Sequence, residues 1–225
     1  MEKLSKPWYK KWWKILLVSF LTIFLIILVA FIFYFHNLVK TAGRNIKQQQ
    51  INLNQQPTQL DLTNNYWAGS AQPIVTIVEF ADFACGYCKN SYTTIREISL
   101  KYKNQLKFVF KDYPLQENSL LLAQAARCAG EQGLFWLMHD KLFQNQGVST
   151  TAQLTELANQ IGADLTKFQD CLTKQKYLPQ IQKDFDQGQA LGLAGTPIWF
   201  INGNKVAGDI PYIMFMQMIE TLLNK

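Results

Sequence analysis

The stretch IVTIVEFADFACGYC, residues 74–88, decides the fold of this chain. Its first seven residues, 74–80, form a β-branched and almost continuous apolar run, which is typical of a strand buried on both faces of a sheet. The stretch ends in a C-x-x-C motif, Cys85-Gly86-Tyr87-Cys88. A buried strand that leads directly into two closely spaced cysteines is therefore the starting point for both the fold and the chemistry.

Apolar residues at helical spacing follow the motif, namely Tyr92, Ile95, Ile98 and Tyr102. They predict a helix that begins at the cysteines and buries one of its faces. A second strand is predicted at 106–110, where the sequence is LKFVF. Because a crossover helix joins the two strands, they should be parallel neighbours.

Residues 115–192 differ from the segments before them, because their apolar side chains recur at helical spacing and predict four or five helices without a strand. The sheet resumes at 197–201, and the Asn202-Gly203 pair predicts a hairpin to a short strand around Lys205-Val206. The last helix is expected to begin near Pro211. The order β-α-β, helical block, β-β-α predicts an α/β protein with a thioredoxin fold that carries a helical insertion at about 115–192.

The position of the two cysteines predicts redox chemistry. Cys85 should lie at the N-terminus of the helix, where unpaired backbone N–H groups and the helix dipole favour an anion and lower the pKa of a thiol. The thiolate is both the nucleophile and the better leaving group in thiol–disulfide exchange. We expect Cys85 to be the exposed sulfur that forms a mixed disulfide and Cys88, one helical turn further on, to be the buried sulfur that resolves it.

Two other interpretations of the motif have weaker support. A C-x-x-C pair can be half of a zinc site, but Cys128 and Cys171 lie far apart in the sequence, His36 belongs to the membrane boundary, and His139 is expected to be a helix-surface or packing residue. A purely structural disulfide in so tight a ring would add little stability through loop closure. We therefore expect no metal and no cofactor.

Glu79 is an ionisable residue inside the otherwise apolar strand that precedes Cys85. Burying such a group is costly unless it has a role. A raised carboxyl pKa near the buried Cys88 would suit proton transfer during thiol exchange. The alternative is a glutamate on a polar strand edge.

An uncharged run from Ile15 to Phe35 predicts a transmembrane anchor at 15–36, after a cytoplasmic N-terminus at 1–14. At about 1.5 Å per residue the run spans roughly 31 Å as a helix, which matches the core of a bilayer. A cleaved signal peptide is the alternative, but its apolar core usually has only about 7–15 residues, and no convincing small-x-small cleavage site follows. Aromatic residues suited to the membrane interface stand at both ends of the run: Trp8, Tyr9, Trp12, Trp13 and Tyr34.

Flanking charges predict the orientation of this anchor. Five lysines precede the span and three basic residues follow it, so the N-terminus should face the cytoplasm and the chain from residue 37 onward should lie outside. The formal net charge of +6 belongs to this N-terminus, because residues 1–50 hold eight of the 22 basic residues and one of the 16 acidic residues. The remainder is nearly neutral, and the charge does not indicate nucleic-acid binding.

All four cysteines lie on the exported side, where an oxidising compartment permits disulfides. Cys128 and Cys171 each lie on an apolar helix face of the helical block. Free buried cysteines are common as packing residues, but in an exported domain a disulfide between the two helices is favoured. It would stabilise the domain by roughly 3–4 kcal/mol in the chain-entropy model.

Residues 37–66 predict a solvated linker, because eleven Asn or Gln residues fall within 45–65. Four apolar residues within this segment are spaced by seven, as at one seam position of a coiled coil, and would support a weak dimerising stalk. They are Val39, Ile46, Leu53 and Leu60. Pro57 and the polar companion positions speak against such a stalk.

Several ordered motifs within 67–225 resemble the DsbA-like disulfide oxidoreductases of the thioredoxin superfamily. They are GSAQPIVTIVEFADFACGYC at 69–88, FVFKDYPL at 108–115, Cys128 followed by GLFW at 133–136, Gly195-Thr196-Pro197, and Asn202-Gly203 ahead of Val206-Ala207-Gly208. The resemblance implies a cis bond between Thr196 and Pro197 beside the active disulfide, with Thr196 main-chain groups pairing with an extended substrate strand. It also implies that Glu79 occupies the buried acidic position of that family.

The chain departs from the family between the cysteines. DsbA-type oxidases usually carry Pro-His there, whereas Gly86-Tyr87 together with Thr196-Pro197 resembles the bacterial disulfide isomerases. The resemblance implies a protein that forms disulfides in unfolded or reduced exported proteins and is reoxidised by a membrane partner of quinone-reductase type. Isomerase or reductase activity is the alternative, and a non-enzymatic assembly or chaperone-like protein with a structural disulfide is a further one.

Overall fold

The structure is a computed structural model that describes residues 9–48 and 57–224. These residues belong to two compact units, divided between Gln50 and Ile51, and each unit is described by itself.

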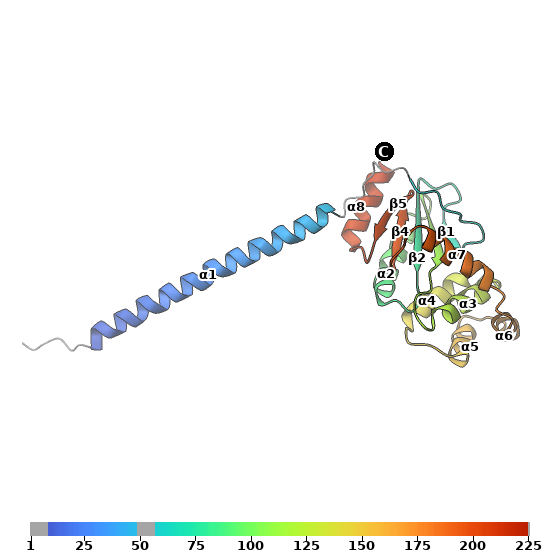
Figure 1. Ribbon diagram of the computed structural model, residues 1–225, viewed down its shortest axis with the longest axis horizontal. Helices are drawn as coiled ribbons and strands as arrows, with labels where there is room; N and C mark the ends of the chain where they lie inside the picture. The colour runs from blue at the N-terminus through green and yellow to red at the C-terminus, as the bar shows by residue number, and fades with distance from the viewer. Residues whose placement is uncertain (1–8, 49–56, 225) are drawn as a thin grey trace, which may run out of the picture. The chain divides into compact units, whose positions relative to one another are not determined.

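The described part of the first unit is one helix, α1 (Tyr9–Gln48), drawn in blue in Figure 1. Its segment Ile15–Asn37 has a mean hydropathy of 3.3 and is long and apolar enough to cross a membrane. The helix continues past Asn37, so the first part of the predicted 37–66 linker is helical and not irregular. No proline interrupts residues 38–48, and extending an existing helix orders only one residue for each new hydrogen bond.

The last part of the predicted linker, residues 57–66, lies against the second unit, and we call it the strap. Leu60 of the strap packs against the core on one face of the sheet, so this member of the predicted heptad belongs to the domain. Leu53, a second member, lies outside the described residues, as do the side chains of Val39 and Ile46. The strap therefore extends the folded domain N-terminally beyond the predicted start at residue 67.

The second unit contains a five-stranded sheet with the order β1-β3-β2-β4-β5. β2 and β3 are parallel, as predicted, and the other neighbours are antiparallel. The strands are β1 (Trp67–Gly69), β2 (Val75–Ala81), β3 (Leu106–Asp112), β4 (Ile198–Ile201) and β5 (Asn204–Ala207). β1 was not expected from the sequence.

Helices surround the sheet in the predicted order (Figure 1). α2 (Gly86–Lys101) links β2 to β3, and α8 (Tyr212–Leu223) ends the chain. Between β3 and β4 lie α3 (Ser119–Gly130), α4 (Phe135–Gln144), α5 (Thr151–Gln160), α6 (Leu165–Thr173) and α7 (Leu178–Ala190). These five helices without a strand confirm the thioredoxin-like α/β fold with a helical insertion.

Alternation along β2 divides the core into two layers. Ile77 and Ala81 face the larger cluster, which contains Cys88 and residues of α2, α3, α4 and α8. Val78 and Phe80 face the smaller cluster, which Phe185 of α7 covers together with the strap. α7 therefore forms a layer on the sheet itself, although it lies within the predicted insertion.

Four charged side chains are buried together between β3, α3 and α7, and each is at most 2% exposed: Lys111, Asp112, Arg127 and Asp184. Asp184 accepts from Lys111 Nζ at 2.7 Å and from Arg127 Nη2 at 2.7 Å. Arg127 Nε donates to Asp112 Oδ2 at 2.5 Å. Burial raises the pKa of Asp112 to about 6, against the lowering effect of Arg127. We call these four residues the ion quartet.

The strap completes the hydrogen bonding of the ion quartet. Lys111 donates to the Asp61 carbonyl at 2.8 Å, Arg127 Nη1 donates to the Asn64 carbonyl at 3.2 Å, and the Asn65 amide donates to Asp184 at 2.6 Å. A buried charge is tolerated only when it is paired and hydrogen-bonded. The ion quartet therefore needs the strap for its hydrogen bonds, and the same bonds hold the strap against the domain.

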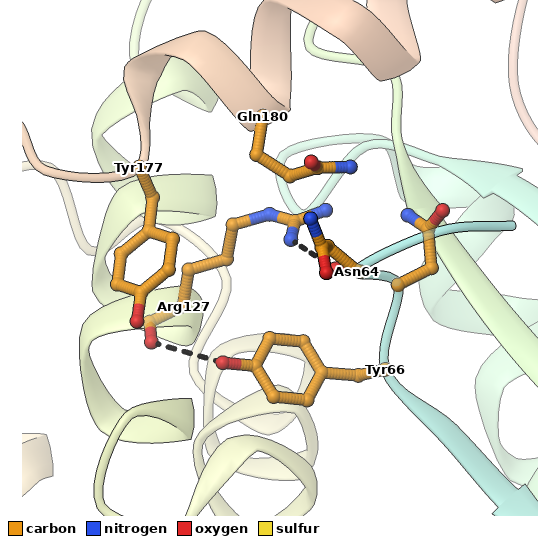
Figure 2. A pocket seen from close by; sticks show the side chains of 6 residues that line it. Asn64, Tyr66, Arg127, Tyr177 and Gln180 are labelled. Carbon is orange, nitrogen blue, oxygen red and sulfur yellow. Dashed lines mark hydrogen bonds between the residues drawn. The ribbon is translucent and has the colours of Figure 1, made fainter.

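Arg127 also lies at a pocket of about 360 Å³ beside the strap. Figure 2 shows its guanidinium group between Asn64 and Gln180, with the Tyr66 hydroxyl directed at the Arg127 carbonyl, to which it donates at 3.4 Å. Three N–H groups of Arg127 are already bonded within the protein. The positive charge of Arg127 is therefore largely compensated within the protein, and the wall of the pocket is polar with little net charge.

Candidate active site

The two cysteines of the motif lie where β2 leads into α2. Cys85 is the N-cap residue of α2, so its sulfur is next to the free N–H groups of the first turn. Cys85 is 6% exposed, Cys88 is fully buried, and both are free thiols. Gly86 is exposed and Tyr87 is 66% exposed, so the two intervening residues form the surface above the pair.

The surroundings of Cys85 favour a thiolate. A hydrogen bond from the Cys88 thiol lowers the pKa of Cys85 to about 5, aided by the Thr196 side chain and by the backbone N–H groups of Cys88 and Tyr87, although burial opposes the shift. Burial raises the pKa of Cys88 far above its ordinary value, and Cys85 and Glu79 raise it further. At neutral pH these opposite shifts favour a negative charge on Cys85 and a proton on Cys88.

Glu79 lies in the middle of β2, opposite Phe110 of β3 and Trp199 of β4, and is 1% exposed. It is not on a polar strand edge. Burial raises the pKa of Glu79 well above its ordinary value, and Cys85 adds to the effect. Among the described residues its Oε1 atom has no hydrogen-bond partner.

Thr196 and Pro197 immediately precede β4 and are joined by a cis peptide bond. In its thiol form Cys85 donates a hydrogen bond from Sγ to the Thr196 carbonyl at 3.3 Å, so Thr196 and Pro197, although distant in sequence, lie directly beside the Cys85 sulfur. Residues of the motif and of the turn before β4 are thus brought together, as the resemblance implied.

Two residues of this region were not predicted, Asp82 and Gln146. The Asp82 carboxylate accepts from the Ala84 N–H at 2.8 Å and from the Leu115 N–H at 2.8 Å. An acidic residue between a buried strand and a C-x-x-C motif would have been a usable signal for Asp82. Gln146 contacts only backbone carbonyls here, and no sequence pattern marks such a contact.

The other predicted residues lie elsewhere. Cys128 of α3 and Cys171 of α6 are joined in a disulfide, and so hold the two helices together. His139 is fully buried among aromatic rings of α4 and its neighbours, which makes it a packing residue. Within the described ranges, no three His, Cys, Asp or Glu side chains converge as metal ligands would.

Comparison with known proteins places this site in a family. A family model described as Thioredoxin (Thioredoxin_4) matches residues 61–221, which includes part of the strap. Among curated proteins, the Na(+)/H(+) antiporter NhaA 1 of Salinispora arenicola is 32% identical over 67% of this chain and 23% of its own length. NhaA 3 of Salinispora tropica is 33% identical over 68% of this chain and 24% of its own length, so the matched part spans about a quarter of these relatives.

Solved structures share the fold. BdbD from Bacillus subtilis has a TM-score of 0.67 at 24% identity and covers 75% of this chain and 98% of its own. The thiol-disulfide exchange protein α-DsbA2 from Wolbachia pipientis has a TM-score of 0.66 at 21% identity, covering 83% and 96%. A periplasmic thioredoxin-like protein from Salmonella enterica serovar Typhimurium has a TM-score of 0.62 at 22% identity, covering 75% and 100%.

The family model spans most of the chain and includes Cys85 and Cys88, which stand at the N-terminus of α2. The chain therefore belongs to the thioredoxin family (Thioredoxin_4), and it shares the fold of BdbD and α-DsbA2.

Proposed function

We propose that this protein transfers disulfides to exported proteins through Cys85 and Cys88. The observation that carries the proposal is the unequal charge of the two sulfurs. The Cys88 hydrogen bond lowers the pKa of Cys85 to about 5, whereas burial raises that of Cys88 above its ordinary value. A sulfur that is stable as a thiolate is the group that substrates attack and release most readily.

The exchange proceeds in two balanced steps. A substrate thiolate attacks Cys85 Sγ of the Cys85–Cys88 disulfide, the S–S bond breaks, and Cys88 leaves and takes up a proton. A second substrate thiolate then attacks the substrate sulfur of the mixed disulfide, and Cys85 leaves as the thiolate. The substrate loses two electrons and gains a disulfide, and the enzyme gains those two electrons as its dithiol form.

The low pKa of Cys85 supports one direction of this transfer. Because a low pKa of Cys85 stabilises the reduced enzyme, its disulfide is the more oxidising. Oxidation of substrates is therefore the proposed direction, with reoxidation by a membrane partner of quinone-reductase type. Gly86 and Tyr87 supply no cationic side chain to the thiolate, so isomerase or reductase activity fed by a membrane electron donor is the competing proposal.

Glu79 and Thr196 are proposed to support the exchange. Glu79, buried with a raised pKa and electrostatically linked to both cysteines, would accept and return the proton of Cys88. The Thr196 main chain lies beside Cys85 and would pair with an extended substrate strand.

We propose that α1 anchors the domain at the outer face of a membrane. Its segment Ile15–Asn37 is long and apolar enough for this, and five lysines precede it. The name of the Salmonella neighbour, a periplasmic protein, supports an extracytoplasmic domain. The names of the Salinispora relatives, which are antiporters, support a membrane setting for a domain of this kind.

The test is a trapping experiment in cells that produce the full chain. A Cys88→Ala variant should accumulate mixed disulfides with exported proteins, and a Cys85→Ala variant should not. Acid quenching and alkylation of the wild type should show the pair mainly oxidised. A mainly reduced pair that still forms mixed disulfides would support the isomerase or reductase, and a Cys88→Ala variant without mixed disulfides would point to a non-enzymatic assembly role.

A further inference from the structure

The side chain of Gln146 reaches the active-site loop from the helical insertion. Gln146 lies in the turn after α4 and is half-buried. Its Nε2 group donates to the Phe83 carbonyl at 2.9 Å and to the Cys85 carbonyl at 2.8 Å. These two carbonyls stand immediately before and after Ala84, so one amide group bridges the backbone on both sides of it.

The chemistry of the side chain suits this position. A primary amide has two N–H donors, and both are used here on two carbonyl oxygens. The opposite orientation of the amide would place Oε1 against the same two oxygens, which would repel it. Gln146 therefore supplies two donors without adding a charge beside Cys85, whereas a carboxylate in its place could not donate at all.

The bridged backbone is the segment that positions the nucleophile. The Cys85 carbonyl also accepts the first backbone hydrogen bond of α2, from the Lys89 N–H at 3.1 Å. On the other side, the Cys85 N–H donates to the Asp82 carbonyl at 3.0 Å. Among the described residues, Gln146 is the one side chain that donates to the carbonyls of Phe83 and Cys85. A shift of this loop would move the Cys85 sulfur away from the N–H groups of Tyr87 and Cys88.

We propose that Gln146 is a positioning residue through which the helical insertion holds the Cys85 loop in the geometry needed for thiol–disulfide exchange. This inference rests on the proposed exchange function and extends it. The insertion thus does more than cover the sheet, because one of its turns holds the backbone of the reactive cysteine.

The test uses the full-length chain in detergent with three substitutions at this position. Gln146→Met keeps the size of the side chain and removes both donors, Gln146→Glu replaces donors with acceptors, and Gln146→Lys restores a donor. Gln144→Met is the matched control, because Gln144 ends α4 and donates to the Tyr92 hydroxyl at 2.7 Å and not to the loop. Circular dichroism and thermal unfolding check that each variant is folded.

Two measurements report on the loop: the pH dependence of Cys85 alkylation, and the rate of exchange with a model disulfide at pH 7. In Gln146→Met the alkylation midpoint should rise by about one pH unit. Exchange at pH 7 should slow by about tenfold because the sulfur is misplaced, and not because it is protonated, since Cys85 would still be mostly ionised at that pH. Gln146→Glu should change the alkylation midpoint and the exchange rate more than Gln146→Met does. Gln146→Lys should bring both quantities part of the way back to the wild-type values, and Gln144→Met should leave both at those values. Wild-type midpoints and rates in folded Gln146→Met and Gln146→Glu would overturn the inference.

Failure of the proposed function gives a different result. If the wild type does not exchange disulfides, the proposed function fails, but the alkylation midpoint of Cys85 still reports whether Gln146 positions it. An active wild type, with unchanged midpoints and exchange rates in the folded Gln146 variants, overturns the positioning role alone.

Discussion

At the scale of single residues, the two cysteines of the motif show how the position of a thiol in the fold changes its pKa. Cys85 has its sulfur at the N-terminal end of α2, where the Cys88 thiol, the Thr196 side chain and backbone N–H groups donate to it. Cys88 lies inside the core, where burial and the negative charges of Cys85 and Glu79 act on it. The first environment favours the thiolate and the second disfavours it. The chemistry of the pair is thus a consequence of where β2 ends and α2 begins.

The reduction potential should therefore depend weakly on pH near neutrality. With the pKa of Cys85 at about 5 and that of Cys88 raised, reduction by two electrons takes up one proton between about pH 5 and 9. The potential should fall by about 30 mV per pH unit between pH 6 and 8, and by about 59 mV per unit below pH 5, where both sulfurs are protonated. Equilibration of the full chain in glutathione buffers at each pH measures this. A slope near 59 mV from pH 6 to 8 would show that Cys85 is an ordinary thiol.

Substitution of Glu79 should separate activity from stability. Glu79→Gln removes the group that we propose as proton acceptor for Cys88, so disulfide exchange at pH 7 should slow by about 10- to 100-fold. Because the buried carboxyl has an unpaired oxygen, the neutral amide should leave the free energy of unfolding unchanged or raise it by about 1 kcal/mol. Stopped-flow exchange and urea unfolding measure the two effects.

Glu97→Gln, on the exposed side of α2, is the control for this substitution and should leave both quantities unchanged. Exchange at the wild-type rate in Glu79→Gln would remove Glu79 from the mechanism.

At the scale of elements, the strap and α7 together enclose the ion quartet. Asp184 of α7 pairs with one cation from β3 and one from α3, and the strap supplies carbonyls and an amide to the same group. The strand end that carries Lys111 and Asp112 is parallel to the end of β2, with Ala81 opposite Asp112. The strap thus contacts the sheet at the C-terminal ends of β2 and β3, and the loop that carries Cys85 begins at the end of β2.

Breaking the ion quartet should destabilise the domain strongly. Asp184→Asn leaves Lys111 and Arg127 without their shared partner, and loss of one member of a buried ion pair typically costs about 3–5 kcal/mol. Asp186→Asn, two residues further on the exposed face of α7, should cost less than about 0.5 kcal/mol. Urea unfolding of the two variants provides the comparison. Equal free energies of unfolding in the two variants would mean that the buried charge of Asp184 does not stabilise the domain.

Sequence patterns revealed the elements that have their own periodicity. β2, α2 and β3 were predicted because apolar runs and helical spacing are local signals. β1 was missed because three residues, Trp67–Gly69, form a strand only by pairing with β3. The extension of α1 to Gln48 was missed because an Asn- and Gln-rich composition resembles a linker.

The residues of the candidate site likewise fall into those that a local sequence pattern predicted and those that only the structure revealed. Cys85, Cys88 and Glu79 stand within one short stretch and were predicted from it, and Thr196-Pro197 was placed beside them only through the family resemblance. Gln146 acts on backbone carbonyls, which have no counterpart in a sequence motif. The ion quartet joins residues from separate elements, with Asn65 bonded to Asp184 across 119 positions, so only the tertiary structure reveals it.

At the scale of the whole molecule, charge and apolar length are concentrated in the N-terminal unit. Residues 1–50 hold eight of the 22 basic residues and one of the 16 acidic residues, and the same unit contains the apolar segment Ile15–Asn37. The domain that carries Cys85 is nearly neutral and has little electrostatic attraction to an anionic lipid surface. Any membrane association of the domain should therefore depend on α1.

Labelling in intact cells should show this arrangement. With lysines before the span and the domain outside, a membrane-impermeant maleimide should modify Cys85 in intact cells after treatment with an impermeant reductant, and the modified chain should sediment with membranes at its full 25.9 kDa. A cysteine introduced by Ser5→Cys in a Cys85→Ala/Cys88→Ala background should react only after the cells are permeabilised.

Replacing the lysines at 10, 11 and 14 by glutamate should weaken this orientation, because basic residues are retained on the cytoplasmic side. A shortened chain that remains in the supernatant would instead identify the apolar segment as a cleaved signal, and labelling of the Ser5→Cys variant in intact cells would reverse the assigned orientation.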